Sequence, residues 1–291
     1  MTLWEAVLLG VVQGVFMFFP VSSTSHLVLV QHWLGQQGSA LPAPESPEMI
    51  LFDLVVHVGT LVSIALVMRR SLAALLGGAW TDLRAVDLRS FGRGRQPHVG
   101  LRLRLCLLGL LAVAVTGALG LLMREPLTSA FAHPLALAAT LTVTGVLLWA
   151  TDVIGPRWRG LRELTPWVAV AIGAAQAVAL LPGISRSGTT IAVALFCGLR
   201  RRWAAEFSFF IAIPTILAGT VIQALLVAAD GAVPTLRPSA YALGFVVAAV
   251  VGAAALALVL HLLYRARFRY FSYYVWALAA GIVLASLTGV L

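Results

Sequence analysis

An arginine set between serines and glycines interrupts a long apolar stretch of the chain, at residues 181–190 (LPGISRSGTT). The flanking runs 168–181 and 191–199 carry no charged residue. A charge inside a membrane segment costs about 3 kcal/mol on insertion scales and therefore usually faces a cavity or a partner. Pro182 and Gly183 break a helix here, so that N–H groups, hydroxyls and the Arg186 guanidinium converge. A guanidinium fork suits phosphate oxygens, and the stretch predicts a phosphate-type anion site.

The alternative interpretation of this stretch is structural. Glycine and serine would line a contact between helices, and Arg186 would sit in an ion pair. We disfavour this interpretation because close helix packing needs small residues but no arginine between two serines.

A second cluster of hydroxyls follows Pro20, near the start of the chain. Serines recur at the same two distances from Pro20 as from Pro182, namely Ser23, Ser25, Ser185 and Ser187. His26 is the one group of the first cluster that titrates near neutral pH, which makes it an acid–base candidate or, less favoured, a nucleophile. Ser23 is a candidate nucleophile if a neighbour takes its proton. A lone histidine beside serines is more often structural, but an arginine inside the membrane on the matching segment favours a catalytic role.

The composition is that of a protein that crosses the membrane several times. Of the 291 residues, 60% are hydrophobic and only 11% are charged, and the mean hydropathy is +0.97. The net charge of +9 does not indicate a nucleic-acid partner, because the basic residues sit in short connections between apolar runs, where topology explains them. Cys106 and Cys197 both lie in apolar runs, which disfavours a disulfide and a cysteine metal site.

Six apolar stretches are long enough to span a bilayer: 49–68, 105–123, 134–150, 207–228, 241–263 and 274–291. Four shorter stretches, 3–19 with 27–34 and 167–181 with 189–199, flank the two proline breaks. We expect each pair to form a re-entrant hairpin of short helices, and the fold class to be an all-α polytopic membrane protein.

The two halves of the chain, 1–152 and 153–291, repeat one plan of a hairpin followed by three spans. Four arginine-bearing connections, 69–104, 157–162, 200–202 and 265–269, hold 17 of the 20 basic residues. All four fall on one side, the cytoplasm, only if the second half is inverted relative to the first. Inverted repeats with broken helices place their site near the midplane, where we expect the two hairpin tips to meet.

Asp53 and His57 lie one helical turn apart in the first predicted span. They either face the same cavity as the hairpin tips or form a buried pair with each other, and the sequence leaves both alternatives open.

Three motifs carry a family resemblance: PVSSTSHL at 20–27, PGISRSGTT at 182–190 and EFSF at 206–209. Along nearly its whole length the chain resembles the bacterial undecaprenyl-diphosphate phosphatases of the bacitracin-resistance type. The resemblance implies an enzyme of the bacterial inner membrane that converts undecaprenyl diphosphate to undecaprenyl phosphate and inorganic phosphate, recycling the lipid carrier of cell-wall synthesis. It also implies six spanning helices, two re-entrant hairpins and an active site open to the periplasm.

By motif position, the resemblance places functional residues at Ser23, His26, Arg186 and Thr190, of which we take the first three as catalytic. We expect the surrounding hydroxyls, N–H groups and amide to complete a phosphate cradle, with these substrate-binding residues: Ser22, Ser25, Ser185, Ser187, Gly188, Thr190 and Gln13.

The resemblance also implies a divalent cation, Mg²⁺ or Ca²⁺, associated with two glutamates in the first short helix. Here those two positions hold Gln13 and Met17, and Asp53 is the nearest remaining carboxylate candidate for a metal ligand. Two functions therefore stay open: a phosphatase, or a non-catalytic carrier or flippase of a polyprenyl phosphate. The expected partners are a polyprenyl diphosphate lipid and the membrane, and the sequence leaves the oligomeric state, including a homodimer, open.

Overall fold

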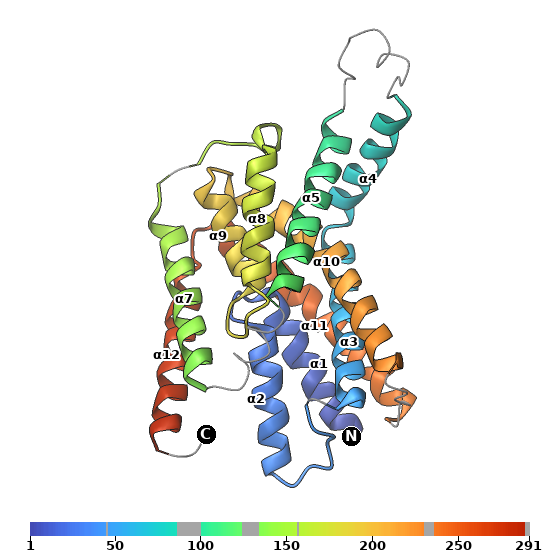
Figure 1. The fold of residues 1–291 in the computed structure, drawn as a ribbon, viewed down its shortest axis with the longest axis vertical. Helices are drawn as coiled ribbons and strands as arrows, with labels where there is room; N and C mark the ends of the chain where they lie inside the picture. The colour runs from blue at the N-terminus through green and yellow to red at the C-terminus, as the bar shows by residue number, and fades with distance from the viewer. Residues whose placement is uncertain (45, 86–99, 124–133, 156, 230–235, 289–291) are drawn as a thin grey trace.

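The computed structural model describes residues 1–44, 46–85, 100–123, 134–155, 157–229 and 236–288, and within these ranges the regular elements are helices (Figure 1). Six of the helices are long and apolar enough to cross a membrane. They are α3 (Pro47–Val67), α5 (Leu101–Leu122), α7 (Pro134–Val153), α10 (Arg201–Ala229), α11 (Pro238–Tyr264) and α12 (Arg269–Leu287). The six predicted spans and the all-α fold class are thus confirmed, with differences mainly at the helix ends.

Four shorter helices form the two predicted pairs, α1 (Leu3–Phe18) with α2 (Ser23–Gln36) and α8 (Pro166–Val178) with α9 (Arg186–Phe196). At 11 to 16 residues these helices are about 17–24 Å long, which is less than the ~30 Å hydrocarbon core of a bilayer. The breaks follow from the chain: Pro20 cannot continue α1, and Gly183 adopts φ 85°, a conformation that favours glycine. The two pairs enter from opposite ends and their turns meet near the middle (Figure 1).

The first helix of each pair packs against a spanning helix from the other half of the chain. On α1, Gly10 and Gly14 approach the backbone of α11 so closely that an added Cβ would lie 2.9 Å from Gly244 O or Gly252 N. On α8, a Cβ at Gly173 would meet the carbonyl oxygen of Ala112 on α5. Small residues allow such contacts inside a membrane. An inverted repeat would produce this pairing, in which the first short helix of each half packs on a spanning helix of the other half. The repeat itself, with its boundary at 152/153, and the re-entrant placement of the hairpins stay predictions.

Hydrogen bonds tie the arginine-bearing connections together at one end of the bundle, opposite the two termini in Figure 1. Arg104 donates to the carbonyl oxygens of Arg162 and Leu164, and Asp152 accepts from both the Arg201 side chain and the Arg269 backbone N–H. This clustering agrees with the positive-inside interpretation, although which side is the cytoplasm stays a prediction. Of the arginines counted from the sequence, Arg89, Arg93, Arg95 and Arg124 lie outside the described residues.

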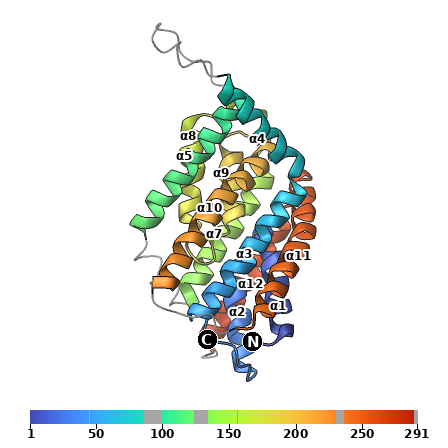
Figure 2. The same ribbon diagram turned by 90° about the vertical axis from the view of Figure 1, so that its right-hand side faces the viewer.

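The connection that begins at Arg69 contains a helix that the sequence analysis did not anticipate, α4 (Arg69–Arg84). It lies beside the first turns of α5, where the Asp82 carboxylate accepts from the backbone N–H groups of Arg102 and Leu103 at 2.9 and 3.1 Å (Figures 1 and 2). The segment looks too polar for a span; Leu75 is buried and Leu72 packs against the core at this end of the bundle, whereas Leu76, Trp80 and Leu83 are exposed.

Candidate active site

The tips of the two hairpins are in contact, as the sequence analysis expected. The backbone N–H of Gly183 donates to Ser25 Oγ at 3.1 Å, and Ser187 Oγ donates to the carbonyl oxygen of Phe18 at 3.4 Å. These bonds join positions more than 150 residues apart in the chain. Residues Ser22, Ser23, Ser25 and His26 therefore lie against the segment that contains Arg186.

The second tip is held in shape by α7, through a residue that the sequence analysis missed. Thr144 Oγ1 donates to the carbonyl oxygen of Gly183 at 2.9 Å and accepts from the backbone N–H of Ser185 at 3.1 Å. Nothing in the sequence marks Thr144, which is one of several threonines in an apolar span. It fixes the backbone just before Arg186.

Most of the predicted phosphate-cradle hydroxyls are already used by the protein. Ser22 Oγ and Ser25 Oγ share a hydrogen bond of 2.9 Å, and Ser185 Oγ accepts from the N–H of Gly188 at 3.1 Å, which caps α9. Thr190 Oγ1 donates to the carbonyl oxygen of Arg186 at 2.8 Å and bonds Ser208 Oγ, which belongs to the EFSF motif but was not among the predicted site residues. These side chains shape the tip, and their predicted contact with substrate stays a prediction.

Arg186 is the first residue of α9, and its two terminal nitrogens are buried without a hydrogen-bond partner among the described residues. The ion pairs in the described part of the chain are Arg201 with Asp152 and Arg202 with Glu206, so the structural ion pair considered for Arg186 is not seen there. Leaving a charged donor buried and unpaired costs several kcal/mol, on the order of 3–5. An anion bound between the fork's two nitrogens would remove that cost.

Gln13 and Ser23 also keep hydrogen-bonding capacity free. Gln13 is fully buried, and neither its amide oxygen nor its amide nitrogen has a partner among the described residues. Ser23 is partly exposed, and the one polar contact of its hydroxyl is a weak one, 4.0 Å from the Met17 sulfur. The predicted site therefore contains two groups of side chains. One group builds the hairpin tips, and the other, Gln13, Ser23 and Arg186, has hydrogen-bonding groups open to a ligand.

His26 has both ring nitrogens engaged. Its Nδ1–H donates to the carbonyl oxygen of Ser22 at 2.7 Å, so in the neutral ring Nε2 accepts from the Tyr274 hydroxyl, 2.8 Å away. Phe16 stacks on the imidazole with the ring centres 3.8 Å apart. Tyr274 on α12 was missed because no sequence pattern links it to a residue near the other end of the chain. In this arrangement His26 takes a proton from Ser23 only after the bond to Tyr274 opens.

The structure shows that the side chains of Asp53 and His57 are not bonded to each other. Gln31 of α2 donates to both Asp53 carboxylate oxygens, at 3.2 and 3.4 Å, whereas His57 Nδ1 donates to the backbone carbonyl of Asp53 at 2.7 Å. His57 Nε2 has no hydrogen bond within the described ranges. Asp53 ties α3 to α2 through Gln31.

The residues at the site do not fit a resident divalent cation. Among the described residues, no group of three or more histidine, cysteine, aspartate or glutamate side chains is placed to hold a metal ion. A hard cation such as Mg²⁺ prefers carboxylate oxygens, and the positions in α1 where the resemblance implies carboxylates carry an amide and a thioether.

The fold and the site together define a multi-pass helical membrane protein with a buried arginine, unpaired among the described residues, between two short hairpins. Comparison with known proteins is more specific. The family described as bacitracin resistance protein BacA matches residues 6–281, and the chain belongs to this family. The undecaprenyl-diphosphatase of Alkalilimnicola ehrlichii is 56% identical over 97% of this chain and 96% of its own, and that of Halorhodospira halophila is 53% identical over 98% of both chains. The undecaprenyl-diphosphatase of Salinibacter ruber is 39% identical over 94% of this chain and 96% of its own.

Proposed function

We propose that this protein is an integral membrane phosphatase that hydrolyses undecaprenyl diphosphate to undecaprenyl phosphate and inorganic phosphate. The observation that carries the proposal is the buried, unpaired guanidinium of Arg186 where the two hairpin tips meet. Relatives of more than 50% identity over nearly the full length bear the name of this activity. The recycled product would serve cell-wall synthesis, and removal of the diphosphate lipid explains a link to bacitracin resistance.

In the reaction, Arg186 grips two oxygens of the terminal phosphate and stabilises the charge that develops on them. The attacking oxygen forms a bond to the terminal phosphorus while the bond between that phosphorus and the bridging oxygen breaks, and lipid monophosphate leaves. If Ser23 Oγ attacks, a phosphoserine forms and water then hydrolyses it. If water attacks directly, Ser23 orients it. In both routes one proton leaves the attacking oxygen, and the products are the same.

We assign the proton acceptor to His57 rather than to His26. Its Nε2 carries a free lone pair in the described structure, and its Nδ1–H is fixed by the Asp53 carbonyl. His26, held by Ser22 and Tyr274, instead supports the turn that presents Ser23. A matched pair of variants tests the assignment: His57→Gln should lower turnover and flatten its dependence on pH, and His26→Gln should lower turnover with that dependence retained.

We place the enzyme in the bacterial inner membrane, with the arginine-bearing end in the cytoplasm and the site open to the periplasm. The support is the clustering of positive charge at one end of the bundle. A cysteine introduced at Ser39 should be labelled from outside intact cells, whereas one at Gly160 or Tyr264 should be protected.

The second candidate function, a carrier or flippase of polyprenyl phosphate, is favoured by one observation. The two carboxylates that the family associates with its metal are replaced by Gln13 and Met17. Phosphate release from undecaprenyl diphosphate by the purified protein, with Mg²⁺ and with chelator, separates the two functions. Release above that of an Arg186→Ala control supports the phosphatase; lipid binding without release under any metal would leave the carrier.

A further inference from the structure

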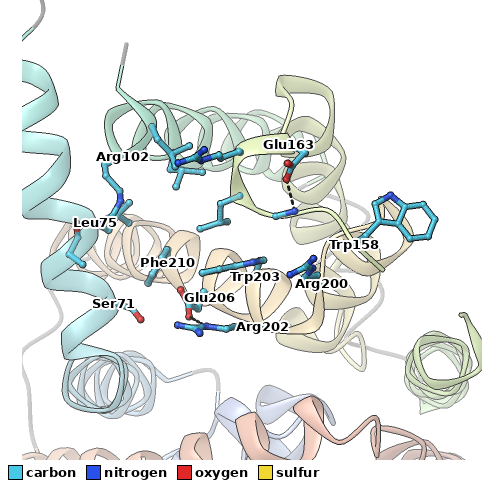
Figure 3. Close-up of a pocket in the computed structure, with 16 residues that line it drawn as sticks. Ser71, Leu75, Arg102, Trp158, Glu163, Arg200, Arg202, Trp203, Glu206 and Phe210 are labelled. Atoms are coloured by element: carbon cyan, nitrogen blue, oxygen red, sulfur yellow. Dashed lines mark hydrogen bonds and ion pairs between the residues drawn. The ribbon is translucent and has the colours of Figure 1, made fainter. Parts of the chain in front are cut away.

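A cavity of about 460 Å³ opens at the arginine-bearing end of the bundle, and none of the residues that line it belongs to the hairpin tips (Figure 3). It lies between α4, the start of α5, the 161–163 turn (η2, Leu161–Glu163) and the start of α10. Its basic and aromatic lining consists of Arg102, Arg162, Arg200, Arg202, Trp158, Trp203 and Phe210. The proposed phosphatase reaction uses none of them.

Part of the charge in this cavity is already neutralised by the protein. Arg202 pairs with Glu206 at 2.9 Å, and the Glu163 carboxylate accepts from the backbone N–H of Gly160. The Arg102 guanidinium donates to the carbonyl oxygen of Ala74. Within the described part of the chain, the guanidinium groups of Arg162 and Arg200 have no partner. With four arginines and two glutamates in its lining, the cavity has an excess of positive charge.

The floor of the cavity is apolar. Leu105 is buried, Phe210 is partly buried, and Arg202 lies over the Trp203 ring at 4.8 Å from its centroid. Glu206 is only 7% exposed and is the first residue of the EFSF motif, whose Ser208 bonds Thr190 at the candidate active site. The motif thus anchors a basic rim above an apolar floor.

Exposed aromatic residues place this rim at the membrane surface. Trp158 in the lining is 76% exposed, and Trp80 and Leu76 on the amphipathic α4 are 55% and 62% exposed. Tryptophans in helical membrane proteins gather at the level of the lipid headgroups, and amphipathic helices lie in the same layer.

We propose that this cavity binds the headgroup of an anionic phospholipid such as phosphatidylglycerol. Arg162 and Arg200 hold the phosphodiester, and an acyl chain lies along the apolar side of the cavity. Basic pockets between spanning helices on the cytoplasmic side recognise anionic headgroups in this way. A membrane lipid is favoured over a soluble anion because the pocket combines unpaired arginines with an apolar floor at headgroup depth. The site is independent of the proposed phosphatase activity.

The test is native mass spectrometry of the purified full chain in a neutral detergent, titrated with phosphatidylglycerol or with phosphatidylcholine of the same acyl chains. The wild type should retain phosphatidylglycerol preferentially. Arg162→Gln/Arg200→Gln should weaken that binding about 30-fold, because each arginine near an anionic headgroup contributes about a factor of five. The matched control is Arg265→Gln/Arg267→Gln, two exposed arginines at the same end but outside the cavity.

Three outcomes would overturn the proposal. Equal binding of the two lipids would show that the cavity does not recognise the charge of the headgroup. Equal loss in both double variants would show a general effect of net charge rather than a site. Displacement of phosphatidylglycerol by millimolar inorganic phosphate would assign the pocket to a soluble anion. Circular dichroism and the thermal unfolding midpoint of each variant verify that it is folded, which is expected because all four arginines are exposed.

Discussion

Gln13 and Gln176 occupy matching places in the two hairpins, each three residues after a glycine that packs on another helix. Both amide oxygens lack a partner among the described residues, but the two amide nitrogens differ. Gln176 donates to Thr116 Oγ1 and Thr215 Oγ1, at 3.1 and 2.9 Å, and so joins α8 to α5 and α10. The Gln13 amide is equally buried but has no partner among the described residues.

The difference teaches that a repeated sequence pattern does not imply a repeated role. Buried polar groups are normally satisfied, so an amide without a partner marks a place where a ligand or water completes the bonding. The first hairpin therefore supplies the open amide and the free Ser23 hydroxyl, and the second supplies the open guanidinium of Arg186. The first hairpin thus contributes neutral hydrogen-bonding groups, and the second contributes the positive charge.

The largest expected effect comes from Arg186→Ala, which should lower kcat/KM about 10²- to 10³-fold because it removes a charged donor from a site poor in water. Arg186→Lys should recover little, since a point charge does not replace a bidentate fork. The thermal unfolding midpoint should not fall, because the lost guanidinium nitrogens have no partner to lose. Arg265→Ala is the control at an exposed position, and near-normal turnover of Arg186→Ala would place the anion site elsewhere.

The second-largest expected effect is on metal dependence, and it is tested by a double variant that returns two carboxylates to the first hairpin. We expect the wild-type protein to bind the diphosphate lipid with a shallow dependence on Mg²⁺, because no carboxylates compete with the substrate for Arg186. Gln13→Glu/Met17→Glu should make hydrolysis depend steeply on Mg²⁺. The measurement is phosphate release against Mg²⁺ concentration in detergent treated with chelator. An equally steep dependence in the wild type would contradict the prediction.

A matched pair of leucine substitutions tests the comparison of the two glutamines directly. Gln13→Leu should lower activity about tenfold while leaving stability equal or higher, because it removes polar atoms that have no partner. Gln176→Leu should lower the free energy of unfolding by roughly 1–2 kcal/mol, from the loss of two hydrogen bonds, with activity nearly unchanged. Turnover assays and thermal unfolding give the activity and the stability of both variants. Equal changes of activity and stability in the two variants would show that the two glutamines do not differ in role.

The smallest expected effect is that of Tyr274→Phe, which removes the hydrogen bond to His26 and leaves the ring packing in place. If His26 orients the first tip, turnover should fall only a few-fold, in line with the loss of one neutral hydrogen bond of about 1 kcal/mol. A rise in turnover would instead indicate that Tyr274 restrains His26 from acting as the base. Steady-state kinetics across pH, with Tyr273→Phe as the neighbouring control, distinguish the two results.

The sequence by itself determined the membrane character, the six spans and the two breaks. These features depend on local properties: apolar length decides whether a helix crosses, and Pro20 and Pro182 mark the two breaks, although Pro214 is accommodated inside α10. The same reasoning pointed to Arg186, because a charge in an apolar run is costly in any fold that buries it.

The tertiary structure alone decided which of the predicted polar side chains are free. Ser25 and Thr190 look like ligands in the sequence but are engaged by Gly183 and Ser208, and His26 is held by a tyrosine 248 residues away. The side chains of Asp53 and His57, one turn apart on the same helix, do not bond each other, because Gln31 donates to the Asp53 carboxylate while His57 donates to the Asp53 backbone carbonyl. A hydrogen bond depends on the atom that the fold brings within about 3 Å, and that atom can lie anywhere in the chain, so residue spacing does not determine it.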